Sequence, residues 1–161
     1  LQIQAYGLGL ARELSSHGVI GSFGVDFVIV PGRGTFLTEV NLRLGGTTHP
    51  FLMARFATEG MYDMATGDLI AGERPKFYVA TDNWKSESFV ALIPSRIVTA
   101  IQQAGLAFDK KTQSGVALHL LGATAQHGKL GATCIGNSST EAQTLHDRAL
   151  EVLHALGAGG R

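Results

Sequence analysis

Apolar and polar residues alternate most regularly between Glu39 and Leu44, and this pattern predicts an extended strand. A period of two residues gives a strand one apolar face and one polar face. The preceding segment, residues 19–30, is rich in β-branched residues, which also favours a strand. The segment Pro31–Gly34 has the composition of a turn. Because a short turn joins antiparallel neighbours, the pattern predicts a hairpin whose second strand covers residues 35–44.

The rest of the chain mixes helical and extended patterns. We predict helices over residues 1–17, 51–64 and 139–156, and a further helix that begins at Pro94 and ends before Gly105. We predict strands over residues 76–80, 115–121 and 130–136, with a turn at residues 127–129. Ser138 and Glu141 have the spacing of a capping box at the start of the last helix. These elements predict an α/β (α+β) fold with an antiparallel sheet.

A polar segment, residues 82–88, is the predicted boundary between two domains. It would separate a first domain, residues 1–81, from a small C-terminal α/β subdomain, residues 82–161. The alternative interpretation of the same segment is an ordinary surface loop.

Composition narrows the classes of function. The chain has 161 residues, of which 45% are hydrophobic and 16% charged, so it can bury a core. Its formal net charge is zero and it has no basic run, which argues against a nucleic-acid partner. It has no apolar run long enough to cross a bilayer, so we expect no membrane partner. The single cysteine, Cys134, fits the reducing cytoplasm and is expected to be a buried small hydrophobe.

Polar side chains of the predicted hairpin carry the candidate chemistry. Glu39 and Asn41 share the polar face of one strand, and Asp26 interrupts the apolar run of the other. Antiparallel pairing can place Asp26 opposite the Glu39/Asn41 row. Two carboxylates and an amide oxygen are ligands that suit a hard cation such as Mg²⁺. The alternative is that Asp26 caps a bulge or pairs with Arg33 or Arg43.

The residues at the end of the second strand are suited to binding an anion. The guanidinium of Arg43 matches phosphate oxygens, and Gly45 and Gly46 leave backbone N–H groups unshielded. The alternative is an edge strand with a solvated face followed by a glycine turn.

Asp26, Glu39 and Asn41 have the order and spacing of the magnesium ligands in ATP-grasp ligases, in which an Asp precedes a Glu-x-Asn motif on the next strand. The longer block Glu39–Phe51 resembles a narrower group, the carboxylate–amine ligases related to the peptide ligase of pheganomycin biosynthesis. A looser similarity continues to about Leu153. Many ATP-grasp ligases carry an arginine two residues before the metal-binding Asp, and this chain has Gly24 there.

The resemblance implies the C-terminal lobe of an ATP-grasp fold, with ATP and Mg²⁺ as cofactors and Mn²⁺ as an alternative ion. It implies the metal ligands Asp26, Glu39 and Asn41, and it places Arg43 at the transferred phosphate or the acyl-phosphate. It also implies that Gly45 and Gly46 donate N–H groups to the oxyanion, and that Thr47, Thr48 and His49 border the amine-substrate pocket.

The implied function is part of an ATP-dependent ligase that joins a small carboxylate to an amine or peptide, forming an amide through an acyl-phosphate. The chain has no lysine-bearing, glycine-rich phosphate loop, and it begins within a helical pattern. We therefore expect a fragment, a processed product or a separate subunit. N-terminal ATP-grasp lobes, in the same chain or in trans, would complete the site, and this chain alone would be inactive.

A second hypothesis keeps the fold but not the catalysis. The chain would then be a non-catalytic binding or assembly module, with residues 85–156 as the surface of a homo-oligomer. His119 and His127 could meet near a ligand in that half, or they could be structural or exposed to solvent.

Overall fold

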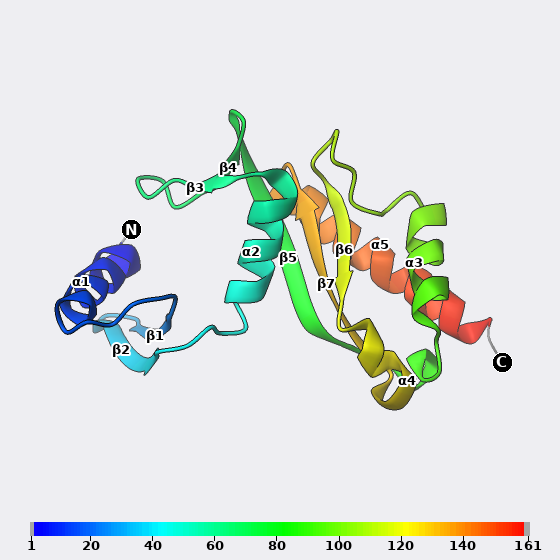
Figure 1. Cartoon of the computed structure of the whole chain (residues 1–161), viewed down its shortest axis with the longest axis horizontal. Helices are drawn as coiled ribbons and strands as arrows, with labels where there is room; N and C mark the ends of the chain where they lie inside the picture. Colours follow the sequence, from blue (N-terminus) through cyan, green and yellow to red (C-terminus); the bar gives the residue numbers. More distant parts are fainter. Residues whose placement is uncertain (1, 160–161) are drawn as a thin grey trace. The chain divides into compact units, whose positions relative to one another are not determined.

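The computed structural model describes residues 2–159 and has an α+β fold with antiparallel sheets, as the sequence predicts (Figure 1). The chain forms two compact units that divide between Phe51 and Leu52. The first unit holds the predicted hairpin, and the second holds the larger sheet and most of the helices.

The first unit consists of one helix and a two-stranded sheet. Helix α1 covers Gln2–Ser16, strand β1 covers Gly24–Val30 and strand β2 covers Gly34–Asn41. The strands pair antiparallel, which confirms the predicted hairpin. The second strand was predicted too long. It ends at Asn41 because the backbone then bends and the Arg43 N–H donates to the Asn41 carbonyl oxygen at 2.7 Å.

The first unit has no core of its own. None of its residues from 2 to 51 is buried, although α1 and the hairpin both carry large apolar side chains. The exposed ones are Ile3, Tyr6, Leu8, Val28, Ile29, Phe36 and Leu37. Between helix and hairpin lies an open pocket of 280 Å³, lined by Tyr6, Leu10, Phe27, Thr35 and Leu37. A helix and a hairpin this small are marginal in water unless further apolar surface covers them.

The second unit is built on a five-stranded sheet with the order β3-β4-β5-β7-β6. Its strands are β3 (Met61–Tyr62), β4 (Leu69–Ala71), β5 (Arg74–Lys85), β6 (Gly115–His119) and β7 (Lys129–Gly136). The three longest confirm the strands predicted over residues 76–80, 115–121 and 130–136. Strand β6 ends earlier than predicted because Leu120 takes a left-handed conformation, with φ 57°.

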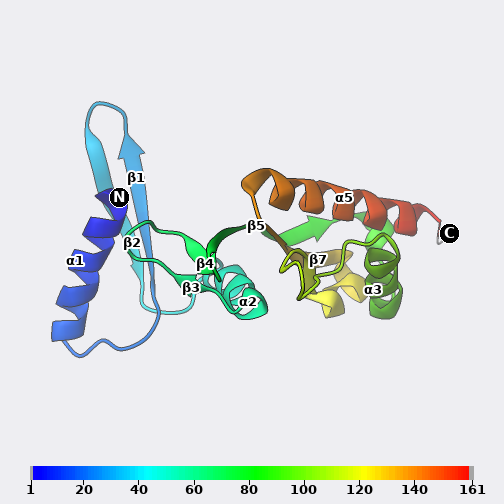
Figure 2. The same cartoon turned by 90° about the horizontal axis from the view of Figure 1, so that it is seen from above.

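Helices close one face of this sheet (Figures 1 and 2). The long helices of this unit are α5 (Ser139–Ala158), which packs against β5 and β7, and α3 (Pro94–Gln103), which packs against α5. The short helices η1 (Glu87–Phe89), η2 (Leu121–Ala123) and α4 (Thr124–His127) lie in the connecting segments. The core joins Ile97 and Ile101 of α3 and Leu153 of α5 to Leu130 and Cys134 of β7. Strand β7 is buried almost throughout, since it lies between β5 and β6 in the sheet and α5 packs against it.

Two predicted elements are corrected here. The helix predicted over residues 51–64 is α2, which covers Thr48–Thr58. It ends there because Glu59 adopts φ 54° and the Gly60 N–H donates back to the Arg55 carbonyl oxygen. The turn predicted at residues 127–129 is preceded by η2 and α4, which Thr124 stabilises by donating to the carbonyl oxygens of Leu92 and Leu121.

The predicted boundary between residues 81 and 82 lies inside β5, so this polar segment is mostly strand and not a linker. Its polarity has a local cause. The pairing of β5 with β7 is interrupted between Thr81 and Trp84, and the two intervening residues are exposed. The assignment of residues 1–81 and 82–161 to separate domains stays a prediction.

Candidate functional site

The hairpin brings the three predicted metal ligands together. Asp26 on β1 pairs directly with Glu39 on β2, and directly paired residues of antiparallel strands share a face. Asn41 lies two residues beyond Glu39 and therefore projects to the same face. The Asn41 side-chain Nδ2 donates to Asp26 Oδ2 at 3.4 Å. Two carboxylates and a carboxamide thus line one patch of the hairpin.

A β-bulge creates this arrangement. The register shifts between Asp26 and Phe27, so that Thr38 is the extra residue of β2. Without the shift, Asp26 would pair with Thr38, and Glu39 would project to the opposite face. The Thr38 hydroxyl donates to the Asp26 carbonyl oxygen at 3.0 Å and holds the bulge. The Asp26 backbone carbonyl thus takes part in the bulge, whereas its carboxylate accepts a hydrogen bond from Asn41.

The patch is open, and among the described residues its two carboxylates form no ion pair. Asp26 and Glu39 are exposed and Asn41 is half-buried. Within residues 2–159, neither Arg33 nor Arg43 forms an ion pair with Asp26. The same residues hold no group of three or more His, Cys, Asp or Glu side chains that could bind a metal ion, so a site here needs the Asn41 amide.

The donor set fits Mg²⁺, because a hard cation prefers carboxylate and carbonyl oxygens. Gly24 contributes space, since it pairs with Asn41 and carries no side chain. A Cβ placed on Gly24 would lie 3.8 Å from the Asn41 Cβ. Gly24 therefore adds no side chain beside Asn41 on the patch.

Arg43 lies outside the strand and does not continue its polar row. It is exposed, and its Nη1 donates to the carbonyl oxygen of the next residue, Leu44, at 3.3 Å. An exposed guanidinium held only by a neighbouring carbonyl can turn toward an anion at little cost.

The glycine turn leads directly into helix α2. The Gly45 N–H donates to Thr48 Oγ1 at 3.1 Å, and the Thr48 N–H donates to the Gly45 carbonyl oxygen at 3.1 Å. This reciprocal pair closes the turn, so the Gly45 N–H already has a partner. Thr48 and His49 begin the helix and Thr47 precedes it. All three predicted substrate residues therefore lie at a helix N-terminus, where the helix dipole favours negative charge.

Sequence reasoning missed a polar network around Lys76 of β5. This lysine is buried, and its Nζ donates to Asn137 Oδ1 at 2.6 Å and to the Gln113 carbonyl oxygen at 3.3 Å. Burial lowers the pKa of Lys76, although the nearby Glu141 carboxylate opposes this shift. The Gln113 side chain in turn donates to the carbonyl oxygen of Thr58, the last residue of α2. The sequence signal for this network was a lysine at the start of an apolar strand.

The serine half of the predicted capping box at the start of α5 is confirmed, whereas the Glu141 side chain reaches the residue before the cap. The Glu141 N–H donates to Ser138 Oγ at 3.0 Å, and Glu141 Oε2 accepts from the Asn137 N–H at 2.7 Å. Partial burial raises the pKa of Glu141, but hydrogen bonds from Asn137 and Ser114 outweigh that effect and lower it.

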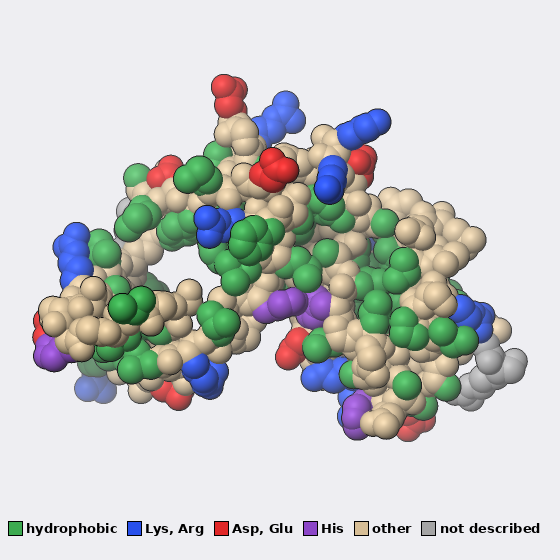
Figure 3. All heavy atoms as spheres, viewed as in Figure 1, with side chains coloured by type: hydrophobic (Ala, Val, Ile, Leu, Met, Phe, Trp, Pro, Cys, Tyr) green, Lys and Arg blue, Asp and Glu red, His purple; other side chains and the backbone are tan. Residues whose placement is uncertain are grey.

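The remaining candidates of the second unit lie on three different elements, β6, α4 and β7. His119 pairs with Gly131 in the sheet, and His127 is exposed at the end of α4. Cys134 is buried, as predicted, and burial raises its pKa to about 12, so the thiol stays neutral. On the face drawn in Figure 3, the Lys and Arg side chains are scattered over the surface.

Comparisons with known proteins agree with the resemblance. Residues 96–149 match the family described as the PGM1 C-terminal domain. The chain is 34% identical over 146 residues to the L-propargylglycine--L-glutamate ligase of Streptantibioticus cattleyicolor. The predicted resemblance to this ligase family is confirmed. The match covers 87% of the chain but only 29% of that ligase.

No solved structure matches the chain. Within residues 2–159, no helix is long and apolar enough to cross a membrane.

Proposed function

We propose that the chain is part of an ATP-dependent carboxylate–amine ligase that forms an amide bond through an acyl-phosphate. The observation that carries the proposal is the convergence of Asp26, Glu39 and Asn41 on one face of the β1–β2 hairpin. The matched relative is named as a ligase of L-propargylglycine and L-glutamate. This supports an amino acid or peptide as the class of substrate.

The reaction divides into two transfers. A substrate carboxylate oxygen attacks the γ-phosphorus of ATP, and the bond to the ADP oxygen breaks. The amine nitrogen then attacks the acyl carbon, the bond to the phosphate oxygen breaks, and the proton lost by the amine leaves with the phosphate. Magnesium ions, or manganese ions in their place, would neutralise the negative charge on the phosphates when bound. Asp26, Glu39 and Asn41 are the residues that would hold them.

Arg43 would bind the transferred phosphate, because its planar guanidinium matches two phosphate oxygens at once. Arg43 is exposed two residues after the end of β2, so its guanidinium is open to an anion.

The glycine turn would stabilise the oxyanion that forms when the amine attacks. The N–H groups of Gly45 and Gly46 are the proposed donors. The Gly45 N–H would first have to leave Thr48 Oγ1, so Thr48 would rotate when the acyl-phosphate is present. Thr47 and His49 would border the amine beside this turn.

The first unit supports the idea that further lobes complete the site. Its apolar side chains on α1 and the hairpin are exposed, and none of residues 2–51 is buried. We propose that ATP-grasp lobes that hold the nucleotide cover this surface, in the same chain or in trans. The chain alone would then bind ATP too weakly for turnover.

Titration calorimetry tests whether ATP binding requires the proposed lobes. When ATP and Mg²⁺ are titrated into the isolated 161-residue chain, we expect no binding in the micromolar range. A protein that also contains the proposed lobes should bind ATP and release ADP when both an amino-acid carboxylate and an amine are supplied. Micromolar affinity of the isolated chain would overturn the need for other lobes. Absence of ADP release from the completed protein with a panel of amino-acid pairs would overturn the ligase assignment.

A further inference from the structure

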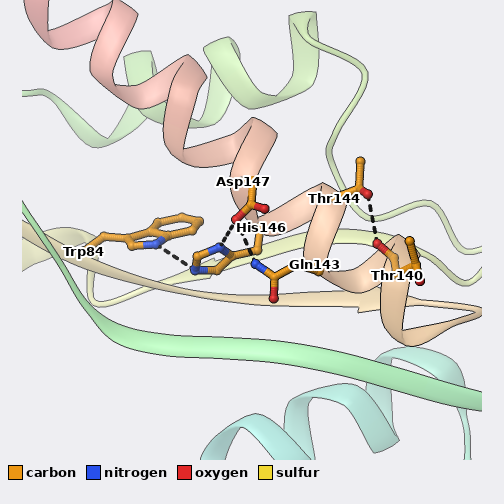
Figure 4. Close-up of polar contacts among 6 residues, drawn as sticks. All are labelled: Trp84, Thr140, Gln143, Thr144, His146 and Asp147. Atoms are coloured by element: carbon orange, nitrogen blue, oxygen red, sulfur yellow. Dashed lines mark hydrogen bonds and ion pairs between the residues drawn. The ribbon is translucent and has the colours of Figure 1, made fainter.

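A chain of side-chain hydrogen bonds joins strand β5 to helix α5 (Figure 4). The Trp84 indole Nε1 lies 3.1 Å from His146 Nε2, and His146 Nδ1 lies 2.9 Å from Asp147 Oδ1. The Trp84 and His146 rings are also in tilted contact, with centroids 5.1 Å apart. The two residues are 62 positions apart in the sequence, so this contact fixes α5 on the sheet.

The contact determines which imidazole nitrogen carries the proton. An indole N–H can only donate, so His146 Nε2 must offer a lone pair. The proton of the neutral ring therefore lies on Nδ1 and is donated to the Asp147 carboxylate. Because Trp84 occupies Nε2 and Asp147 occupies Nδ1, this histidine–aspartate pair is not arranged as a general base for a substrate.

Protonation of His146 is incompatible with this arrangement. A second proton on Nε2 would turn it into a donor facing the Trp84 N–H, and two donors at 3.1 Å cannot share a hydrogen bond. The buried indole would lose its hydrogen-bond acceptor. The protonated imidazole ring would carry a full positive charge and form an ion pair with Asp147.

We propose that the Trp84–His146 contact is an acid-sensitive latch between β5 and α5, which opens when His146 takes a proton from solvent. Trp84 is 5% exposed and the His146 side chain 19%, so solvent reaches the ring although the indole is in the core. Opening weakens the attachment of α5, the helix that packs along β5 and β7.

The groups that face His146 define the charge balance of the latch. On α5, the Asp147 carboxylate accepts hydrogen bonds from His146 and from Gln143, and these bonds lower its pKa. On β5, Trp84 does not titrate. On β7, Cys134 has an electrostatic interaction with Asp147, and its thiol is neutral across the range in which a histidine titrates. The negative charge next to the ring is therefore constant while His146 gains its proton.

Fluorescence of the isolated chain tests the proposal, because Trp84 is its single tryptophan. We expect the emission of Trp84 to change with pH through one protonation step, and to return when the pH is restored. His146→Gln should lose this step, since a glutamine side-chain oxygen can accept from the indole at every pH. His154→Gln is the matched control, because the His154 ring contacts Phe89 and not Trp84. This variant should keep the protonation step.

A second variant and an NMR measurement test the same proposal. Asp147→Asn retains an acceptor but removes the charge that stabilises the imidazolium, so the midpoint should move to lower pH. Nitrogen NMR of the unmodified chain should find the neutral ring protonated on Nδ1. A step that persists in His146→Gln, or a neutral ring protonated on Nε2, would overturn the proposal.

Discussion

Glu39→Gln in a complete protein that carries this chain is expected to reduce the rate of amide formation by roughly 100-fold or more. Glutamine preserves the shape of the side chain but removes the negative charge that would hold a cation beside the ATP phosphates. The measurement is ADP release at saturating ATP and Mg²⁺, with each substrate varied in turn.

The matched control for this change is Glu151→Gln. Glu151 is an exposed glutamate on α5, in the second unit, and its change should leave the rate unaltered. Unaltered amide formation in Glu39→Gln would remove Glu39 from the metal site and leave the convergence with Asp26 without a catalytic role.

Phe89→Ala is expected to lower the free energy of unfolding by about 3–5 kcal/mol. Phe89 is fully buried in η1, belongs to the core between the sheet and the helices, and contacts the His154 ring of α5 at a centroid distance of 5.0 Å. Truncation would leave a cavity where η1 meets α5. Urea unfolding of the isolated chain, followed by Trp84 emission, measures the change.

Phe56→Ala is the control for the loss of a phenyl ring. Phe56 is 70% exposed on α2, so its truncation should change the unfolding free energy by less than about 0.5 kcal/mol. Equal effects of the two substitutions would contradict the assignment of the core to the η1–α5 contact.

Local signals predicted much of the fold. The alternation before Leu44 and the turn at Pro31–Gly34 were sufficient for the hairpin, because period and turn chemistry are encoded by neighbouring residues. The serine half of the capping box, at Ser138, succeeded for the same reason. Strand and helix ends were less accurate, since they depend on single backbone conformations such as the left-handed Leu120.

The geometry of the candidate site could be predicted only in part. The sequence placed Asp26 near Glu39, but the bulge at Thr38 decides whether the two side chains share a face, and threonine carries no signal for a bulge. The polar residues Asp82 and Asn83 suggested a linker because they lie where the β5–β7 pairing is interrupted. The Lys76 network and the Trp84–His146 contact join residues far apart in sequence, so no local pattern reveals them.

The most direct test of the proposed metal site is a crystal structure of the complete protein with a non-hydrolysable ATP analogue and Mg²⁺. We predict metal ions at about 2.0–2.1 Å from side-chain oxygens of Asp26, Glu39 and Asn41, bridging them to the phosphates. Metal ions bound to the nucleotide without contact to these three side chains would contradict the assignment of the hairpin as the metal site.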